Sequence, residues 1–280
     1  MRYFWLRGIF LLIVLTICIS SCNTSKNQNE IDLSYFGSVN IIKEIGGEMY
    51  VLNSTESSVY KLKEGRLELF RDIDIGGRDF VLDFDITGAK VCYSNTYDEI
   101  FVSSSSSIED TIKVLNPDRI EVADSKLFVT SRKAEDGRFY IRSVDAETGK
   151  LLNKVSINDE AVSGMTFSKI SIAVNSYRLW AVNDLRKRVE VYNFELELME
   201  SYPLDVCYEY GNFYISDEWI RILSSRDGKI FIAESPLLEF KQDITDTGIG
   251  SGNFDISASC ITGNIMYLYD FINSRISIFR

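Results

Sequence analysis

The sequence predicts an all-β fold, a six-bladed β-propeller of four-stranded antiparallel blades that occupies residues 30–280. Two observations carry this prediction. Short runs rich in Val, Ile, Tyr and Phe recur between clusters of Gly, Asn, Asp and Ser, which is typical of strands joined by turns. No segment keeps apolar residues at helical spacing over three turns, so helices are not expected.

The strand patterns repeat as strand–turn–strand units that begin near residues 48, 90, 126, 178, 212 and 264. Their mean step of about 43 residues fits a propeller blade of four strands. A β-sandwich would not repeat a strand pair at this period, and a β-helix repeats about every 20 residues. The predicted strand pairs are Glu48–Leu52 with Val59–Leu62, Lys90–Tyr93 with Ile100–Val102, Lys126–Thr130 with Phe139–Val144, Arg178–Val182 with Arg188–Tyr192, Asn212–Ile215 with Ile220–Leu223, and Asn264–Leu268 with Arg275–Phe279.

The last unit lacks an outer strand, because the sequence stops after the apolar segment Arg275–Phe279. A surplus segment, Glu30–Phe36, precedes the expected inner strand of the first blade at Val39–Ile45. We expect this N-terminal segment to pair beside Arg275–Phe279, which closes the ring and covers an open sheet edge.

The segment before residue 30 predicts export and lipidation. Residues 1–21 combine two arginines with a short apolar run, as signal peptides do, and the run is too short to span a membrane. Ile19-Ser20-Ser21-Cys22 resembles a bacterial lipobox, in which the cysteine is lipidated; an ordinary secretory signal is the alternative. Residues 22–29 then read as a flexible tether. Asn23, where an aspartate would indicate inner-membrane retention, favours the outer membrane.

Composition excludes some function classes. The net charge is −11, and −13 once residues 1–21 are removed, so nucleic acid is not an expected partner. The chain has no histidine and no zinc-type cysteine spacing. Cys92, Cys207 and Cys260 are expected to be buried free thiols, with a Cys207–Cys260 disulfide as the alternative.

Two units go beyond periodicity. Gly248–Asp255 followed by Asn264–Asp270 and Asn273–Phe279 resembles an NHL repeat, and Leu179–Asp184 with Arg188–Tyr192 matches it again. In both, an aspartate precedes an arginine by four or five residues, which predicts a β-turn capped by the aspartate and spanned by the arginine. With the lipobox, the chain resembles the NHL- or TolB-like propeller lipoproteins of Gram-negative bacteria.

Propellers bind ligands where the loops before the innermost strands converge at the mouth of the central channel. The candidate ligand-binding residues there are Arg78, Asp79, Asp118, Arg119, Asp159, Glu160, Asp205, Asn253 and Asp255. Carboxylates in this set could hold Ca²⁺, although Asp and Asn in turns more often bond backbone N–H groups. No metal or other cofactor is therefore expected, and calcium stays the alternative.

Catalysis has little support in the sequence. There is no histidine for acid–base chemistry and no Gly-x-Ser-x-Gly elbow, and Gly248-x-Gly-x-Gly252 precedes strands where a phosphate loop would open a helix. Trp180, Tyr208, Tyr210 and Trp219 could form a stacking surface, but packing between sheets is the favoured interpretation. The sequence thus favours a membrane-anchored module in the cell envelope that binds a protein, peptide or glycan. A calcium-dependent hydrolase or lactonase is the alternative.

Overall fold

The computed structural model describes residues 30–279, apart from positions 38, 73–80, 105–108, 162–169, 176, 184, 205–210, 216–219, 227–228, 235–238, 244–255 and 263–264. Between residues 211 and 257 it gives the backbone strands alone. The predictions for residues 1–29, including Cys22, lie outside this range. Within the described part there is no helix that is long and apolar enough to cross a membrane.

The described strands pair into six four-stranded sheets, and every pair with a stated register is antiparallel. The first three sheets in chain order are β2(Val39–Ile45), β3(Glu48–Asn53), β4(Ser58–Lys63) and β5(Arg66–Asp72); β6(Val81–Thr87), β7(Lys90–Asn95), β8(Glu99–Ser103) and β9(Asp110–Lys113); and β10(Pro117–Ala123), β11(Lys126–Ser131), β12(Tyr140–Asp145) and β13(Leu151–Ser156). The other three are β14(Ile170–Val174), β15(Leu179–Asn183), β16(Arg188–Tyr192) and β17(Leu198–Pro203); β18(Gly211–Ile215), β19(Ile220–Arg226), β20(Lys229–Glu234) and β21(Glu239–Asp243); and β22(Ile256–Thr262), β23(Ile265–Asp270), β24(Arg275–Phe279) and β1(Glu30–Asp32).

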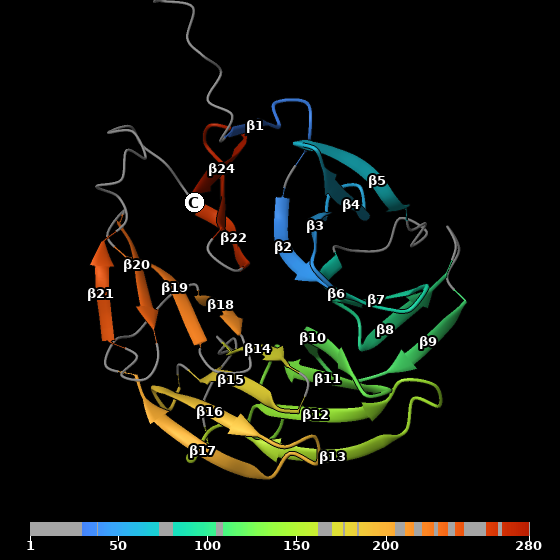
Figure 1. Ribbon diagram of the computed structural model, residues 1–280. Coiled ribbons are helices and arrows are strands. Elements are labelled where there is room, and N and C mark those ends of the chain that lie inside the picture. Colours follow the sequence, from blue (N-terminus) through green and yellow to red (C-terminus); the bar gives the residue numbers. More distant parts are fainter. Residues whose placement is uncertain are drawn as a thin grey trace, which may run out of the picture. The chain divides into compact units, whose positions relative to one another are not determined.

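The first strands of the sheets lie innermost and surround a central channel, as Figure 1 shows. Strands β2, β6, β10, β14, β18 and β22 contact one another in that order, and β22 contacts β2. This arrangement of four-stranded antiparallel blades around an axis is a β-propeller. The core lies between neighbouring sheets, where the side chains of strands such as β7 and β11 are almost fully buried.

The prediction of six like blades needs correction. Five sheets have described side chains, whereas β18–β21 is defined by its backbone pairing alone. The predicted fifth unit is also out of phase: Asn212–Ile215 and Ile220–Leu223 lie in β18 and β19, the innermost and second strands. The other predicted pairs lie in the second and third strands of their sheets. Residues 211–234 contain three successive apolar strand patterns, so the sequence alone does not show which of them is the innermost strand of the sheet.

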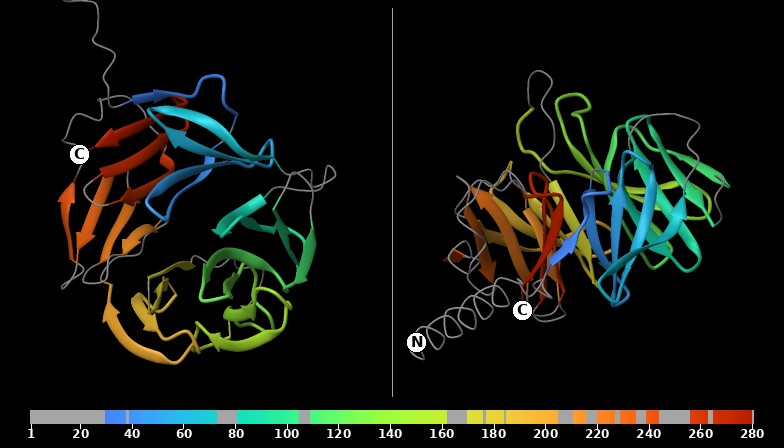
Figure 2. Two further views of the ribbon diagram at one scale, coloured as in Figure 1. Left: turned by 45° about the vertical axis from the view of Figure 1, so that its right-hand side comes forward. Right: turned by 90° about the horizontal axis from the view of Figure 1, so that it is seen from above.

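The N-terminal segment completes the last sheet, as expected. Strand β1 lies beside β24, and the Leu33 N–H donates a hydrogen bond of 2.8 Å to the carbonyl of Ser274. Ile31, Leu33 and Phe36 are buried in one cluster with Ala258, Tyr269 and Ile276 of the last sheet and with residues of the first sheet. Figure 2 shows the dark-blue N-terminal segment beside the red strands of the last sheet. The first and last parts of the described chain therefore share a core.

Candidate functional site

The central channel contains a cavity of about 330 Å³ that is lined by the innermost strands. We call this the channel cavity. Its charged or polar lining residues come from β2, β6, β10, β14 and β22, and they are Lys43, Glu44, Asp83, Asp85, Arg119, Glu121, Ser171 and Ser259. A cavity of this size suits a small ligand.

Bulges shape the entrance of the channel. Four innermost strands carry a register shift near their first residues: β2 between Val39 and Ile41, β6 between Val81 and Asp83, β10 between Pro117 and Ile120, and β22 between Ile256 and Ala258. A bulge leaves one strand with extra residues and turns their side chains away from the regular alternation. At this place two residues of β10, Asp118 and Arg119, lie opposite the single residue Thr130 of β11.

Two aspartates of β6 close the open edge of β10. An innermost strand has one edge without a partner strand, so its N–H groups need other acceptors. Asp83 Oδ2 accepts the Ile120 N–H at 2.9 Å, and Asp85 Oδ2 accepts the Val122 N–H at 2.5 Å. Both carboxylates also accept an N–H from the residue that follows them on β6, at 2.9 and 2.7 Å. The two aspartates thus bond the second blade to the third.

Lys43 of β2 pairs with the buried carboxylates of Asp83 and Glu121. Its Nζ lies 3.2 Å from Asp83 Oδ2 and 2.9 Å from Glu121 Oε1. It also donates to the carbonyls of Phe84 and Ile120, at 3.0 and 2.8 Å. The Lys43 side chain is 16% exposed and that of Asp83 only 1%. One ammonium therefore joins the first three blades at their innermost strands.

Burial and charge oppose each other in this cluster. Burial raises the pKa of Glu121 to about 8 and that of Asp85 to about 6, while the nearby Lys43 ammonium lowers both. Burial by itself lowers the pKa of Lys43, but the carboxylates of Asp83, Glu121 and Asp85 outweigh it, and the net pKa is raised. Lys43 is therefore a fixed cation, whereas Glu121 can hold a proton at neutral pH.

Arg119 is the second cation of the channel cavity. It is partly buried, and its backbone N–H donates to Thr130 Oγ1 at 3.0 Å. Within the described residues, its guanidinium has no carboxylate within ion-pair distance and no hydrogen-bond acceptor. On the far side of the cavity, β14 and β22 contribute Ser171, Ala173, Ser259 and Cys260, which are small and uncharged. The cavity thus has a charged wall and a neutral wall.

The predicted mouth residues do not come together as a set. Arg119 lines the cavity, and Asp118 beside it is a partly buried carboxyl whose pKa is raised by burial, against the opposing effect of the Arg119 charge. Asp159 and Glu160 are exposed in the segment after β13 and do not line the cavity. Asp159 instead forms an ion pair of 2.7 Å with Arg186. Arg78, Asp79, Asp205, Asn253 and Asp255 lie outside the described residues.

The pair Asp159–Arg186 belongs to a polar cluster at one end of the fourth sheet. Arg186 also bonds Glu190 Oε1 at 2.9 Å, and Glu190 Oε2 accepts from the Tyr192 hydroxyl at 2.8 Å and from Asn183 Nδ2 at 2.9 Å. Asn183 Nδ2 further donates to the Ile157 carbonyl at 2.8 Å. Because these groups bind one another and the backbone, the cluster fixes the turn after β15 against the segment that leads into β14.

One of the two predicted aspartate-capped turns is confirmed, and asparagines cap other turns after the second strands. The Asn273 N–H donates to Asp270 Oδ1 at 3.3 Å, and Arg275 Nε lies 3.8 Å from Asp270 Oδ2, as the NHL-like pattern predicted for this turn. In the fourth sheet the described cap is Asn183, whose Oδ1 accepts the Arg186 N–H at 3.2 Å, while Asp184 lies outside the described residues. Asn53 and Asn95 accept turn N–H groups in the first two sheets.

Sequence reasoning missed Lys43, Asp83, Asp85 and Glu121, because it sought the site in loops. A signal was available in Asp83-Phe84-Asp85, where acids occupy alternate positions of an otherwise apolar strand. An innermost strand has protein on both faces, so charges within it need partners across the channel.

Other predicted features have mixed outcomes. Cys92 and Cys260 are free thiols, which leaves no disulfide at Cys260, and Cys207 lies outside the described residues. Trp180 is packed in the core at 8% exposure, as favoured, while the other three aromatics of that prediction are not described. Within the described part of the chain, no three carboxylate or thiol side chains are grouped so that they could hold a metal ion.

Solved structures support the propeller fold. BamB from Moraxella catarrhalis superposes with a TM-score of 0.56 at 11% identity over 86% of this chain and 85% of that one. The WD40 β-propeller domain of Doa1 gives 0.51 at 11% identity over 88% and 93%, and the computationally designed Ika8 protein gives 0.51 at 12% identity over 86% and 70%. No family model matches the sequence, and no curated protein matches it. At these identities the likeness shows the fold alone.

Proposed function

We propose that this propeller is a protein-binding module of the cell envelope, held at a membrane by a lipid on Cys22. The β-propeller fold is consistent with such a module. The observation that carries the proposal is a set of exposed large apolar side chains in the loops of one face of the propeller.

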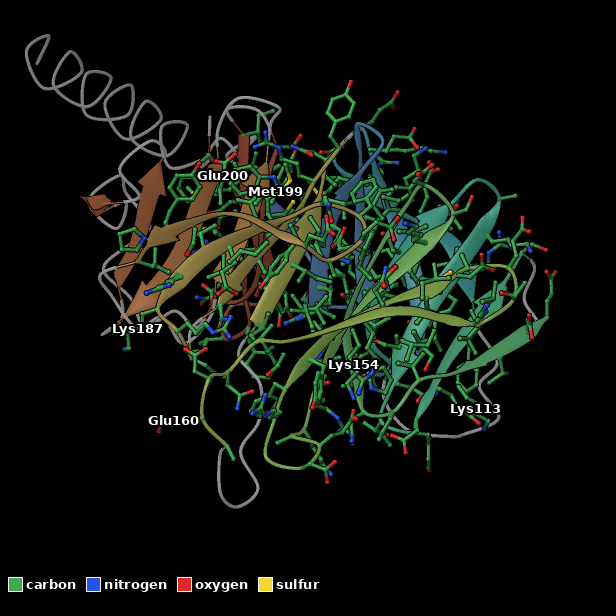
Figure 3. All side chains as sticks on the ribbon, turned by 90° about the horizontal axis from the view of Figure 1, so that it is seen from below. Lys113, Lys154, Glu160, Lys187, Met199 and Glu200 are labelled. Atoms are coloured by element: carbon green, nitrogen blue, oxygen red, sulfur yellow. The ribbon has the colours of Figure 1, made fainter. Side chains whose placement is uncertain are left out.

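One face of the propeller bears the turns after the second strands and the segments that enter the innermost strands. We call this the turn face. Hydrogen bonds join its parts: the Val114 N–H donates to the Asp98 carbonyl at 3.1 Å, and Arg132 Nη2 donates to the Thr96 carbonyl at 2.9 Å. Figure 3 shows Lys113, Glu160 and Lys187 toward this side of the molecule, and Met199 and Glu200 toward the other.

Most large apolar side chains exposed at the ends of the sheets lie on the turn face. They are Tyr35 at 75% exposure, Tyr97 and Leu115 at 46%, Leu185 at 36%, Phe271 at 53% and Ile272 at 56%. On the opposite face, the described residues include Tyr177 before β15, and Leu151, Leu198 and Met199 at the starts of the outer strands β13 and β17. Single exposed apolar residues are ordinary, whereas several in the loops of one face, with Phe271 and Ile272 adjacent in the chain, are typical of an interaction surface.

Two features favour a protein as the partner. Aromatic side chains contribute strongly to the energetics of protein interfaces, and Tyr35, Tyr97 and Phe271 make up half of this set. A net charge of −11 also makes direct contact of this face with an anionic membrane surface unfavourable. The resemblance to NHL- or TolB-like lipoproteins and the lipobox support an outer-membrane location, with the tether of residues 22–29 giving the domain reach.

The test is crosslinking of the full-length protein in cell envelopes. We expect a protein adduct that is lost in the double variant Phe271→Ser/Ile272→Ser and kept in the matched control Leu198→Ser/Met199→Ser on outer strand β17. Equal adducts from both variants would overturn the proposed face. Separately, Cys22→Ser should release the protein from the membrane fraction, and continued sedimentation with membranes would contradict the lipid anchor.

A further inference from the structure

The channel cavity contains two functional groups that the structure itself does not satisfy. Among the described residues, the Arg119 guanidinium has no bound acceptor, and Glu121 uses Oε1 for Lys43 and has no donor at Oε2. Both residues belong to β10 and both line the cavity. A positive donor fork and a carboxylate oxygen are thus presented side by side to one small space.

The remaining charges of the cavity are already used. Asp83 and Asp85 accept backbone N–H groups of β10, and Glu44 Oε1 accepts the Gly47 N–H at 2.5 Å. Lys43 is held by Asp83, Glu121 and two carbonyls. These groups hold the blades together and have little capacity left for a ligand. Among the described lining residues, the acids outnumber the cations, which disfavours a ligand with a net negative charge.

We propose that the channel cavity binds a free amino acid, with its carboxylate on Arg119 and its ammonium on Glu121. Arginine presents a planar fork that binds a carboxylate through two parallel hydrogen bonds. The ligand is electrically neutral overall, which suits a cavity with excess acid. A volume of about 330 Å³ accommodates a molecule of this size. Ser171 on the neutral wall offers a further hydrogen bond to it.

Ligand binding to Glu121 should change the protonation of this carboxyl group, and the change can be measured. Glu121 faces Lys43 and Glu44 of β2, Asp83 and Asp85 of β6, and Arg119 of its own strand, while the described lining of β14 and β22 adds no charge apart from the Cys260 thiol. Burial raises the pKa of Glu121 to about 8, so the empty site holds a proton at pH 7. An ammonium bound at Glu121 favours the charged carboxylate, and binding at pH 7 therefore releases a proton.

The experiment is isothermal titration of the full chain with the twenty common L-amino acids, each at millimolar concentration, in two buffers of different ionisation enthalpy. We expect at least one amino acid to bind at pH 7 with proton release. N-Acetylated and amidated forms of that amino acid, which lack the ammonium and the carboxylate respectively, should both bind at least about tenfold more weakly. If the acetylated form binds as well as the free one, the ligand is a carboxylate such as a peptide end, and the proposal is wrong.

Variants separate the site from general effects on folding. Arg119→Gln should weaken binding about tenfold to a hundredfold, because a charge-assisted pair is lost. Arg178→Gln, which removes a surface arginine paired with Glu200 on β17, should leave binding unchanged. Glu121→Gln should weaken binding and abolish proton release. The proposal is overturned if none of the amino acids binds to the wild-type protein. It is also overturned if Arg119→Gln binds as tightly as the wild type and has an unchanged melting temperature. The turn face is a separate surface, so either outcome is independent of the proposed protein-binding role.

Discussion

Replacing Lys43 by methionine should destabilise the propeller, and the loss should grow with pH. Methionine keeps most of the volume of the side chain but removes an ammonium that contacts Asp83, Glu121 and two carbonyls. Removing one partner of a buried ion pair costs about 3–5 kcal/mol. Because the side chains of Lys43 and Glu121 are 16% and 15% exposed, we take the lower end, about 3 kcal/mol, for the loss at pH 8.5.

The pH dependence follows from the carboxyl groups. The folded-state pKa values of Glu121 and Asp85, about 8 and about 6, lie above the ordinary values of 4.5 and 3.8. Groups with raised pKa values bind more protons in the folded state, so they favour folding at low pH and reduce stability as pH rises through the folded pKa. At pH 5 Glu121 is protonated with or without Lys43, and the loss falls to lost hydrogen bonds, about 1–2 kcal/mol. At pH 8.5 the variant lacks the Lys43 ammonium that offsets the negative charge of these buried carboxylates, so the loss is larger.

The assay is urea unfolding followed by tryptophan fluorescence at pH 5, 7 and 8.5. Lys113→Met is the matched control, because Lys113 pairs with Glu99 on the surface and its side chain is 78% exposed. Its loss should stay below about 1 kcal/mol at every pH. The reasoning is refuted if the loss for Lys43→Met equals that of the control, or if it shrinks as pH rises.

Three further predictions concern the seam of the ring and the polar cluster. Leu33→Ala should cost about 3 kcal/mol, since Leu33 is fully buried between the first and last sheets, whereas Leu152→Ala on outer strand β13 should cost far less. Deletion of residues 276–280 should lower the melting temperature of the whole domain, and a nearly unchanged value would contradict closure by β1. Asn183→Ala should cost about 1–3 kcal/mol in urea unfolding, because Glu190 and Ile157 lose a buried partner. Asn193, a partly buried residue whose side chain bonds Glu195 and Glu197 within its own turn, provides the comparison. Equal losses would argue against a special structural role for the cluster.

The sequence predicts the fold well because blade strands carry local signals. Alternating apolar residues and capped turns define β3, β4, β7 and β8 within a residue or two, and the surplus segment before Val39 predicts how the ring closes. The phase of the fifth unit was wrong, because pairing order within a blade is decided by contacts across the ring. Periodicity alone does not contain those contacts.

The candidate site was predicted less well, for a different physical reason. Arg119 was identified because it precedes an innermost strand, and a bulge does turn it into the channel cavity. Asp159 has the same kind of position in the sequence but is captured by Arg186, a partner brought near by the fold. Which of two similar side chains remains available depends on such long-range partners.

The division of labour in the channel follows from the edge of β10. A propeller leaves the innermost edge of each blade without a partner strand, and β10 meets this need with carboxylates from β6. Those carboxylates must be buried, so a cation must be buried with them, and Lys43 supplies it from β2. Most of the charge at the axis is thereby committed to joining blades. Arg119 lies at a bulge, outside the regular alternation of side chains. It is therefore not needed to bond the edge of β10 or to neutralise the aspartates of β6. Acidic residues in the channel of a propeller are therefore poor evidence for a metal site by themselves. A side chain without a structural partner among the described residues, such as Arg119, is a better indication of a ligand.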